Sequence, residues 1–155
     1  MIIVECYSDE YLIKQIGSCG RRIWHEEGKG NVISLCSKQC DVIGLIDADP
    51  TSTQPGLKEQ YRVTEKFGKL TFYRKKDNSP NILIQITPRL EDWLIERARI
   101  NNMPIRDYDL PESPRHLHRI KHIEKDRRFH RFISHLIGRD AEIQKIKDVI
   151  KEASG

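Results

Sequence analysis

The sequence has no apolar run that approaches the roughly 20 residues needed to cross a bilayer. Its first residues, MIIVECYSDE, also lack the basic start and the small-residue cleavage site of a signal peptide. Cysteine is scarce, with four residues at positions 6, 19, 36 and 40. Without a secretion signal, these cysteines are expected to be reduced and mostly buried. We therefore expect a cytoplasmic protein with no membrane partner.

Common nucleotide-binding and zinc-binding motifs are absent as well. There is no Gly-x-Gly-x-x-Gly segment and no Walker loop, so nucleotide binding by those routes is not predicted. Neither the pair Cys36 and Cys40 nor the group His116, His118 and His122 matches the spacing of paired Cys-x2-Cys zinc ligands. We expect exposed histidines and a buried thiol pair. The alternative that one of these histidines transfers a proton or binds phosphate stays open.

What the sequence does contain is a series of short apolar runs that alternate with helix-like segments. Its 155 residues are enough for one hydrophobic core without disulfides. Strands are predicted at residues 1–6, 32–36, 42–46, 70–73 and 82–86. A first helix is predicted from an N-cap at Ser8, through Ile23 and Trp24, to an end at glycines 28 and 30. Two more helices are predicted across 57–67 and across 90–100, the latter with Pro88 in its first turn. This alternation predicts an α/β, Rossmann-like fold with a mostly parallel sheet.

The last third of the chain has a purely helical pattern. Pro104, Pro111 and Pro114 mark a linker across residues 101–114. Two apolar stripes at helical spacing follow it: Phe129, Phe132, Ile133, Leu136 and Ile137, and then Ile143, Ile146, Val149 and Ile150. We expect an α/β domain at residues 1–102 and a basic helical appendage at residues 115–155. The two phenylalanines on the first stripe are expected to pack in the core and not to stack on bases.

Acidic side chains follow two of the predicted strands. Glu5 lies near the end of the first strand, and Asp47 and Asp49 end the strand at 42–46, with Pro50 opening the loop beyond them. Parallel sheets bind ligands beyond the carboxyl ends of their strands, so the three carboxylates meet if these strands are neighbours. Ionised carboxylates held close together repel one another unless a cation neutralises them. Their oxygen ligands suit Mg²⁺ or Mn²⁺; the alternative is that the acids only close the strands.

These residues resemble the TOPRIM domain, which primases, topoisomerases, small maturation ribonucleases and overcoming-lysogenisation-defect nucleases share. The similarity covers roughly residues 1–100 and depends on Glu5 in IIVECYSDEYLIK and on Asp47 and Asp49 in VIGLIDADP. The resemblance implies that Asp47 and Asp49 hold Mg²⁺. It also implies that Glu5 acts as a general acid or base or shares the metal.

Three further segments bear on this resemblance. Ser8-Asp9-Glu10 is similar to a segment that follows the glutamate in the nuclease branches, and ITPRLEDWLIE resembles an acidic helix start in overcoming-lysogenisation-defect nucleases. The latter places Glu91 as a further metal ligand. Cys6 is a departure, because the family usually has glycine there, and glycine lets backbone approach a phosphate closely.

Basic charge is concentrated in residues 115–139. There, eight Lys or Arg side chains are opposed by two acidic ones, while the whole chain carries only +4. Lys and Arg that neutralise phosphates dominate non-specific affinity for nucleic acid. The predicted DNA or RNA contacts are Arg115, Arg119, Lys121, Lys125, Arg127, Arg128 and Arg131. The alternatives are a solvated helix face or a surface for a partner protein or a second copy of the chain.

These patterns together predict metal-dependent hydrolysis of phosphodiester bonds in nucleic acid, with Mg²⁺ or Mn²⁺ as cofactor. An alternative is a non-catalytic TOPRIM-like module that binds nucleic acid or a partner protein, which Cys6 favours. A third hypothesis is a domain for a small ligand, in which Glu5 lies far from Asp47 and Asp49.

Overall fold

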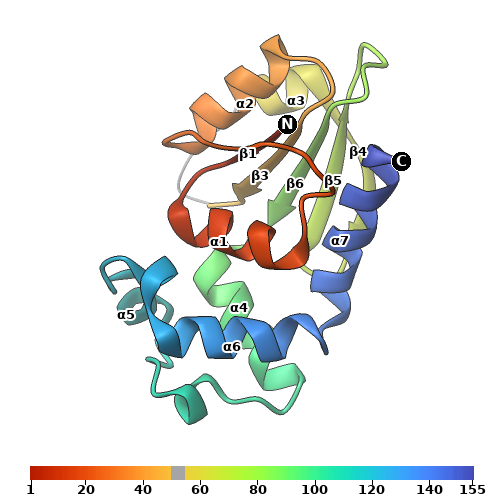
Figure 1. Cartoon of the computed structure of the whole chain (residues 1–155). Helices are drawn as coiled ribbons and strands as arrows, with labels where there is room; N and C mark the ends of the chain where they lie inside the picture. The colour runs from red at the N-terminus through yellow and green to blue at the C-terminus, as the bar shows by residue number, and fades with distance from the viewer. Residues whose placement is uncertain (50–54) are drawn as a thin grey trace.

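The computed structural model describes residues 1–49 and 55–155; Pro50 lies outside the described residues. Within them the chain forms an α/β fold around a mixed, mostly parallel sheet with strand order β2-β1-β3-β6-β5-β4 (Figure 1). The strands are β1 (Ile2–Val4), β2 (Ile23–His25), β3 (Ile43–Asp47), β4 (Tyr61–Phe67), β5 (Leu70–Lys75) and β6 (Ile82–Ile86). Strands β2, β1, β3 and β6 run parallel, and β5 and β4 continue the sheet in antiparallel pairings.

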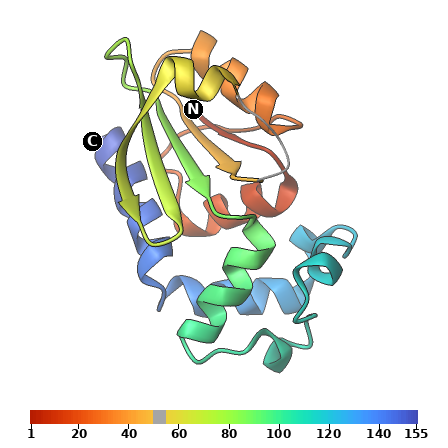
Figure 2. The same ribbon diagram turned by 180° about the vertical axis from the view of Figure 1, so that it is seen from behind.

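Helices pack on both faces of this sheet and beyond the carboxyl ends of its parallel strands (Figure 2). They are α1 (Tyr7–Ile16), α2 (Lys29–Lys38), α3 (Pro55–Gln60), α4 (Leu90–Ile100), α5 (Pro114–His118), α6 (Arg127–Ile137) and α7 (Ala141–Ser154), with 3-10 turns η1 (Ile105–Tyr108) and η2 (Ile123–Lys125). Because side chains alternate along a strand, Ile2 and Val4 face a large apolar layer with α1, α4, α6 and α7, whereas Ile3 faces a smaller layer with α2 and α3. None of the helices in the described ranges has the length and apolarity that a bilayer crossing requires.

Much of the predicted secondary structure is confirmed. Strands form within or across the segments predicted at 1–6, 42–46, 70–73 and 82–86, and α4 occupies the predicted helix at 90–100. The two C-terminal stripes form α6 and α7, with Phe129 and Phe132 buried. Pro88 precedes α4 instead of lying in its first turn, because Arg89 is the N-cap residue.

The strand predicted at 32–36 is wrong, since these residues lie in α2. Val32, Ile33 and Cys36 share one helical face, which packs on the sheet. Close packing of α2 depends on Gly44 of β3, where a methyl group would lie 2.7 Å from the Cys36 sulfur. Cys40 is exposed, so the expected buried thiol pair is also wrong.

The long helix predicted from Ser8 is wrong at both ends. Cys6 is the N-cap residue, and the helix ends at Gly17, whose φ of 106° favours glycine. Ile23 and Trp24 instead belong to β2, which pairs in parallel with β1. Cys19, like Cys40, is exposed, so the cysteines are not mostly buried as expected.

The helix predicted across 57–67 is wrong for most of its length. Helix α3 ends at Gln60, and the next residues form β4, which pairs antiparallel with β5. Gly68, with a φ of 58°, lies in the turn between these strands. The polar side chains of β4 are exposed at the edge of the sheet, which explains why the segment lacks an apolar strand pattern.

The C-terminal helices share the large apolar layer with the sheet. Residues of the 101–114 segment that belong to this layer are Met103, Ile105, Tyr108 and Leu110. A buried ion-pair network also joins α4 to α7: Nε of Arg97 lies 2.6 Å from Oδ1 of Asp140, and the same guanidinium contacts Glu142. Glu142 in turn accepts a hydrogen bond from the backbone N–H of Lys69 in the β4–β5 turn. The network therefore ties the hairpin and both helices together.

Candidate metal and nucleic-acid site

The carboxyl ends of β1 and β3 lie side by side. These strands are adjacent and parallel, with Val4 opposite Leu45. Glu5 follows β1, and its Oε2 accepts a hydrogen bond from the backbone N–H of Asp47 at 3.0 Å. Glu5 and Asp47 are thus brought together, and the wide separation expected for a small-ligand domain is not observed.

Asp47 also joins the sheet to α4. Its Oδ1 accepts a hydrogen bond from the backbone N–H of Leu90 at 3.1 Å, one of the N–H groups that a helix start leaves without an intrahelical partner. This contact brings Glu91 to the same end of the sheet. Oε1 of Glu91 lies 2.9 Å from Nδ1 of His118 on α5, so the C-terminal region contributes to the site as well.

Asp9 is a further carboxylate of the site, and the sequence reading did not include it among the metal ligands. Its side chain is 2% exposed, and Oδ2 accepts hydrogen bonds from the Cys6 backbone N–H at 3.3 Å and from the Cys6 thiol at 3.1 Å. Oδ1 is buried and has no hydrogen-bond partner among the described residues. The available signal was the similarity of Ser8-Asp9-Glu10 to the nuclease branches. A buried carboxylate oxygen without a donor is costly unless a proton or a cation reaches it.

We call Glu5, Asp9, Asp47 and Glu91 the acidic cluster. Burial raises the pKa of Asp47, and the charges of the other three carboxylates raise it further. Burial likewise raises the pKa of Asp9, with additional repulsion from Glu5 and Glu91. The pKa of Glu5 is raised mainly by burial. These shifts have the same direction because each carboxylate is buried and lies near others of the same charge.

Lys29 and Asp49 lie beside the acidic cluster and have opposite effects on the pKa of Glu5. Lys29 is 7% exposed, and its Nζ donates a hydrogen bond to the carbonyl of Ala48 at 2.9 Å. Its charge lowers the pKa of Glu5, whereas the charge of Asp49 raises it. Asp49 has a φ of 27°, and its backbone N–H donates to the carbonyl of Pro88. The buried lysine is thus a site residue that the sequence reading missed.

An open cleft of about 1100 Å³ contains the predicted carboxylates. The acidic residues that line it are Glu5, Asp9, Asp47, Asp49, Glu91 and Asp92. The basic residues are Lys29, Arg89, Arg115 and Arg119, and His118 also lines the cleft. Arg115 and Arg119 come from α5 and the residue that follows it, so residues distant in sequence line the same cleft. The cleft combines a cation-attracting acidic part with basic groups that suit phosphate.

The other predicted nucleic-acid contacts are not in the cleft lining. Arg128 forms an ion pair with Asp126 at 2.7 Å and donates to the carbonyl of Asp109. The guanidinium of Arg131 lies 5.3 Å from the ring centroid of Tyr108. The remaining members, Lys121, Lys125 and Arg127, are exposed. Arg115 and Arg119 therefore adjoin the acidic cluster, whereas Arg128 and Arg131 contact residues outside the cleft.

The donor chemistry of the cluster fits Mg²⁺ or Mn²⁺, although no preformed cage is present. Within residues 1–49 and 55–155, no group of three His, Cys, Asp or Glu side chains is arranged to hold a metal ion. Glu5, Asp9 and Asp47 each already accept a backbone N–H. A carboxylate has further acceptor capacity beyond one such bond, and no donor in the part of the chain that the structure describes reaches the buried Oδ1 of Asp9. These clustered hard oxygens are the ligands that the two cations prefer.

Cys6, at the position where the resemblance to TOPRIM domains leads one to expect glycine, lines the cleft. Its Sγ is 2.9 Å from Oγ of Ser8 in addition to its contact with Asp9. Burial, reinforced by the charge of Asp9, raises the pKa of the thiol, so it remains neutral and can donate to the carboxylate. The side chain therefore stabilises the position of Asp9 while it occupies space beside it.

Comparison with protein-family models, with curated proteins and with solved structures found no match to this chain.

Proposed function

We propose that the cleft is a TOPRIM-like site for metal-dependent hydrolysis of phosphodiester bonds in cytoplasmic nucleic acid. The observation that carries this proposal is the convergence of the acidic cluster at the ends of β1 and β3, in one cleft with Arg115 and Arg119. A cation stabilises carboxylates that are held close together, and arginines in the same cleft can bind the charged phosphates of a substrate. A small neutral ligand would use neither feature.

Asp47 and Asp49 would hold Mg²⁺ or Mn²⁺, with Asp9 and Glu91 as further oxygen ligands; Glu5 would either share the metal or accept a proton. When bound, the ion supplies positive charge that stabilises the phosphoryl oxygens and lowers the pKa of a water molecule. Because the pKa values of Glu5, Asp9 and Asp47 are raised, protons compete with the cation. Metal affinity is therefore expected to increase with pH.

The protein side chains divide the remaining tasks. Glu5 accepts a proton from the attacking water, for which its raised pKa is suited. The water oxygen bonds to phosphorus, the bond from phosphorus to the leaving oxygen breaks, and the leaving oxygen takes a proton from solvent. Arg115 and Arg119 bind phosphate oxygens and position the chain. Lys29 keeps positive charge beside Glu5.

The test is cleavage of labelled single-stranded and duplex DNA and RNA with Mg²⁺ or Mn²⁺. Asp47→Asn is the decisive variant, because asparagine keeps an acceptor for the Leu90 N–H and removes the charge. We expect a loss of activity of roughly 100-fold or more, as for other groups that stabilise transition-state charge. Asp148→Asn, at an exposed position of α7, is the matched control and should cleave like wild type. Cleavage by Asp47→Asn at the wild-type rate would contradict the proposal.

A non-catalytic module that binds nucleic acid or a partner protein is the second candidate. The thiol of Cys6 in the cleft lining favours this candidate. So does the absence, among the described residues, of three His, Cys, Asp or Glu side chains arranged to hold a metal ion. This candidate predicts nucleic-acid binding without cleavage for every substrate and metal. It also predicts that Cys6→Gly gains no activity, whereas an obstructed nuclease would gain some.

A further inference from the structure

We infer that the groove beside the acidic cluster binds a single-stranded segment of nucleic acid and that Tyr7 stacks on one of its bases. This inference deepens the proposed function and rests on it for the identity of the ligand. Tyr7 is the first residue of α1, two positions after Glu5, and is 57% exposed. A large aromatic side chain that adjoins the acidic cluster is therefore accessible to a ligand.

The ring of Tyr7 is already supported from one side. It stacks on His25, with 4.3 Å between ring centroids and an interplanar angle of 28°. His25 ends β2, and its Nε2 lies 2.9 Å from the carbonyl oxygen of Glu5, so the pair is anchored to the sheet. A ring held in place loses little conformational freedom when a ligand binds to it.

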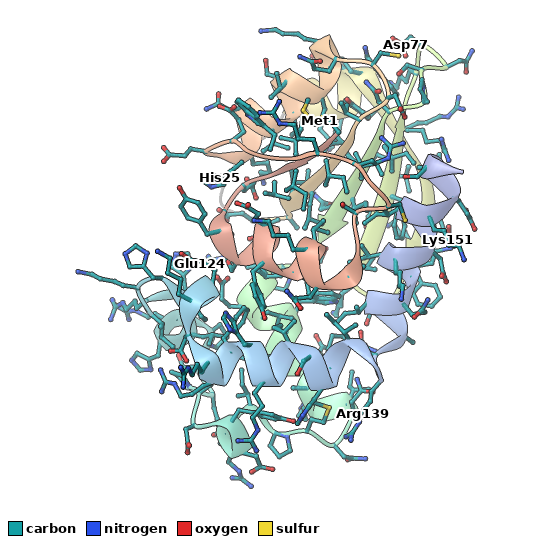
Figure 3. All side chains as sticks on the ribbon, in the orientation of Figure 1. Met1, His25, Asp77, Glu124, Arg139 and Lys151 are labelled. Carbon is teal, nitrogen blue, oxygen red and sulfur yellow. The ribbon has the colours of Figure 1, made fainter. Side chains whose placement is uncertain are left out.

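Tyr7 also lines two neighbouring hollows, the first of which adjoins the cleft, and together they form the path proposed for the strand. One hollow of about 220 Å³ is lined by Tyr7 and shares Cys6, Glu91 and His118 with the cleft of the acidic cluster. A second hollow of about 440 Å³ is lined by Tyr7, Tyr11, Lys14 and Lys125. Both hollows include Glu124, which lies on the same side of the molecule as His25 (Figure 3).

Basic side chains that can contact a polynucleotide backbone are present at both ends of this path, although Glu10 and Glu124 also line the farther hollow. Arg115 and Arg119 lie in the cleft, and Lys125 lies in the farther hollow. Lys14 is paired with Glu10 at 2.5 Å and is a weaker candidate for phosphate. Proteins that bind single strands combine cationic groups for the backbone with aromatic rings for the bases.

The accessible ring selects for a single strand and against a duplex. Bases within a duplex are stacked on their neighbours, so their faces are covered, whereas an unstacked base can lie on an aromatic side chain. Both single-stranded DNA and single-stranded RNA present such bases. The arrangement therefore favours an unpaired segment next to the phosphodiester bond at the acidic cluster.

The test measures affinity without cleavage, in EDTA, by fluorescence anisotropy. The probes are labelled oligothymidylate and oligouridylate of about 12 nucleotides, within the usual site size of single-strand-binding folds, and a duplex of the same length. Wild type should bind at least one single strand about 5-fold or more tightly than the duplex. Tyr7→Ala should weaken that binding by about 5- to 100-fold, the range for loss of one base stack, and Tyr7→Phe should not.

Trp24→Ala is the matched control. Trp24 is also an exposed aromatic residue, 41% exposed, and precedes His25 in β2, but the two hollows are lined by other residues. This variant should bind like wild type. Quenching of 2-aminopurine in the oligonucleotide should decrease with Tyr7→Ala, which reports stacking directly, and thermal unfolding should show that the variant remains folded.

The outcomes separate this inference from the nuclease proposal. Weaker binding by Tyr7→Ala with no cleavage under any condition supports the inference and contradicts the nuclease. Cleavage by wild type together with unchanged binding by Tyr7→Ala supports the nuclease and overturns the inference. Equal affinity for duplex and single strand, or no binding to any of the three probes, also overturns it.

Discussion

Oε2 of Glu5 accepts a hydrogen bond from the backbone N–H of Asp47 at 3.0 Å, which joins the ends of two neighbouring parallel strands. Asp47 in turn accepts a hydrogen bond from the backbone N–H of Leu90, the first residue of α4. The same contacts hold carboxylates close together, so the stability of this region depends on protons and cations as well as on packing.

Without divalent cations, we expect the free energy of unfolding to decrease as pH rises above about 5. The pKa values of Glu5, Asp9 and Asp47 are raised in the folded state, above unfolded values of about 4. The folded protein therefore binds more protons, and the stability present at low pH is lost as pH rises through the folded pKa values. Glu91 and Asp49 add to the repulsion. Thermal unfolding in EDTA from about pH 5 to pH 9 measures the effect.

Divalent cations should reverse this decrease in the free energy of unfolding at high pH. Mn²⁺ or Mg²⁺ at about 100 times the dissociation constant should add about 2.7 kcal/mol, with a larger effect at high pH, where the carboxylates are ionised. Asp47→Asn should flatten the pH profile and reduce the response to the cation. A melting temperature that depends on neither pH nor cation would contradict the assignment of the acidic cluster.

Arg115 and Arg119 should contribute more to nucleic-acid affinity than Arg128 and Arg131. The first pair lies in the cleft, whereas the second pair has local contacts. We expect the double substitution Arg115→Gln, Arg119→Gln to weaken binding about 10-fold or more at low salt. It should also reduce the slope of log affinity against log salt by about 1 to 2. The double substitution Arg128→Gln, Arg131→Gln is the control, and an equal effect from it would contradict the cleft as the binding surface.

Arg97→Met should destabilise the protein by about 3–5 kcal/mol, because it leaves buried carboxylates without their cation. Asp140 and Glu142 are 2% and 3% exposed, and both contact the Arg97 guanidinium. Arg99→Met on the same helix is the control, since Arg99 is exposed, and should change stability by about 0.5 kcal/mol or less. Denaturant unfolding measures both, and equal stability of the two variants would contradict a structural role for the network.

Gly44→Ala should destabilise the protein by about 1–3 kcal/mol through overpacking. The new methyl group would lie 2.5 Å from a methyl of Leu83 and 2.7 Å from the Cys36 sulfur, so α2 and β6 would have to move. At Gly56 a methyl group would meet no atom of residues 1–49 and 55–155 within 4 Å, so Gly56→Ala should be close to neutral. An unchanged midpoint of unfolding for Gly44→Ala would show that the α2 interface is looser than described.

The sequence patterns that predicted structure well were those with a long period or a fully buried environment. The apolar stripes of α6 and α7 repeat over several turns, and β3 and β6 are buried runs. The wrong predictions came from short segments. Val32 to Cys36 has a composition that suits either a strand or one face of a helix, and only packing on β3 distinguishes them. Strand β4 is mostly polar, so its pairing with β5 had no apolar signal.

The sequence by itself determined which carboxylates follow buried strands and where the basic residues are concentrated. It therefore pointed to Glu5, Asp47 and Asp49 as candidates for one site. The TOPRIM resemblance added Glu91 to them. Only the tertiary structure decided that Asp9 joins these carboxylates, that Arg115 and Arg119 line the same cleft, and that Tyr7 is exposed beside it. These groups come from different strands and helices, and their distances depend on strand order and helix packing. Local residue patterns do not encode those long-range contacts, because each pattern reports only on the faces of its own element.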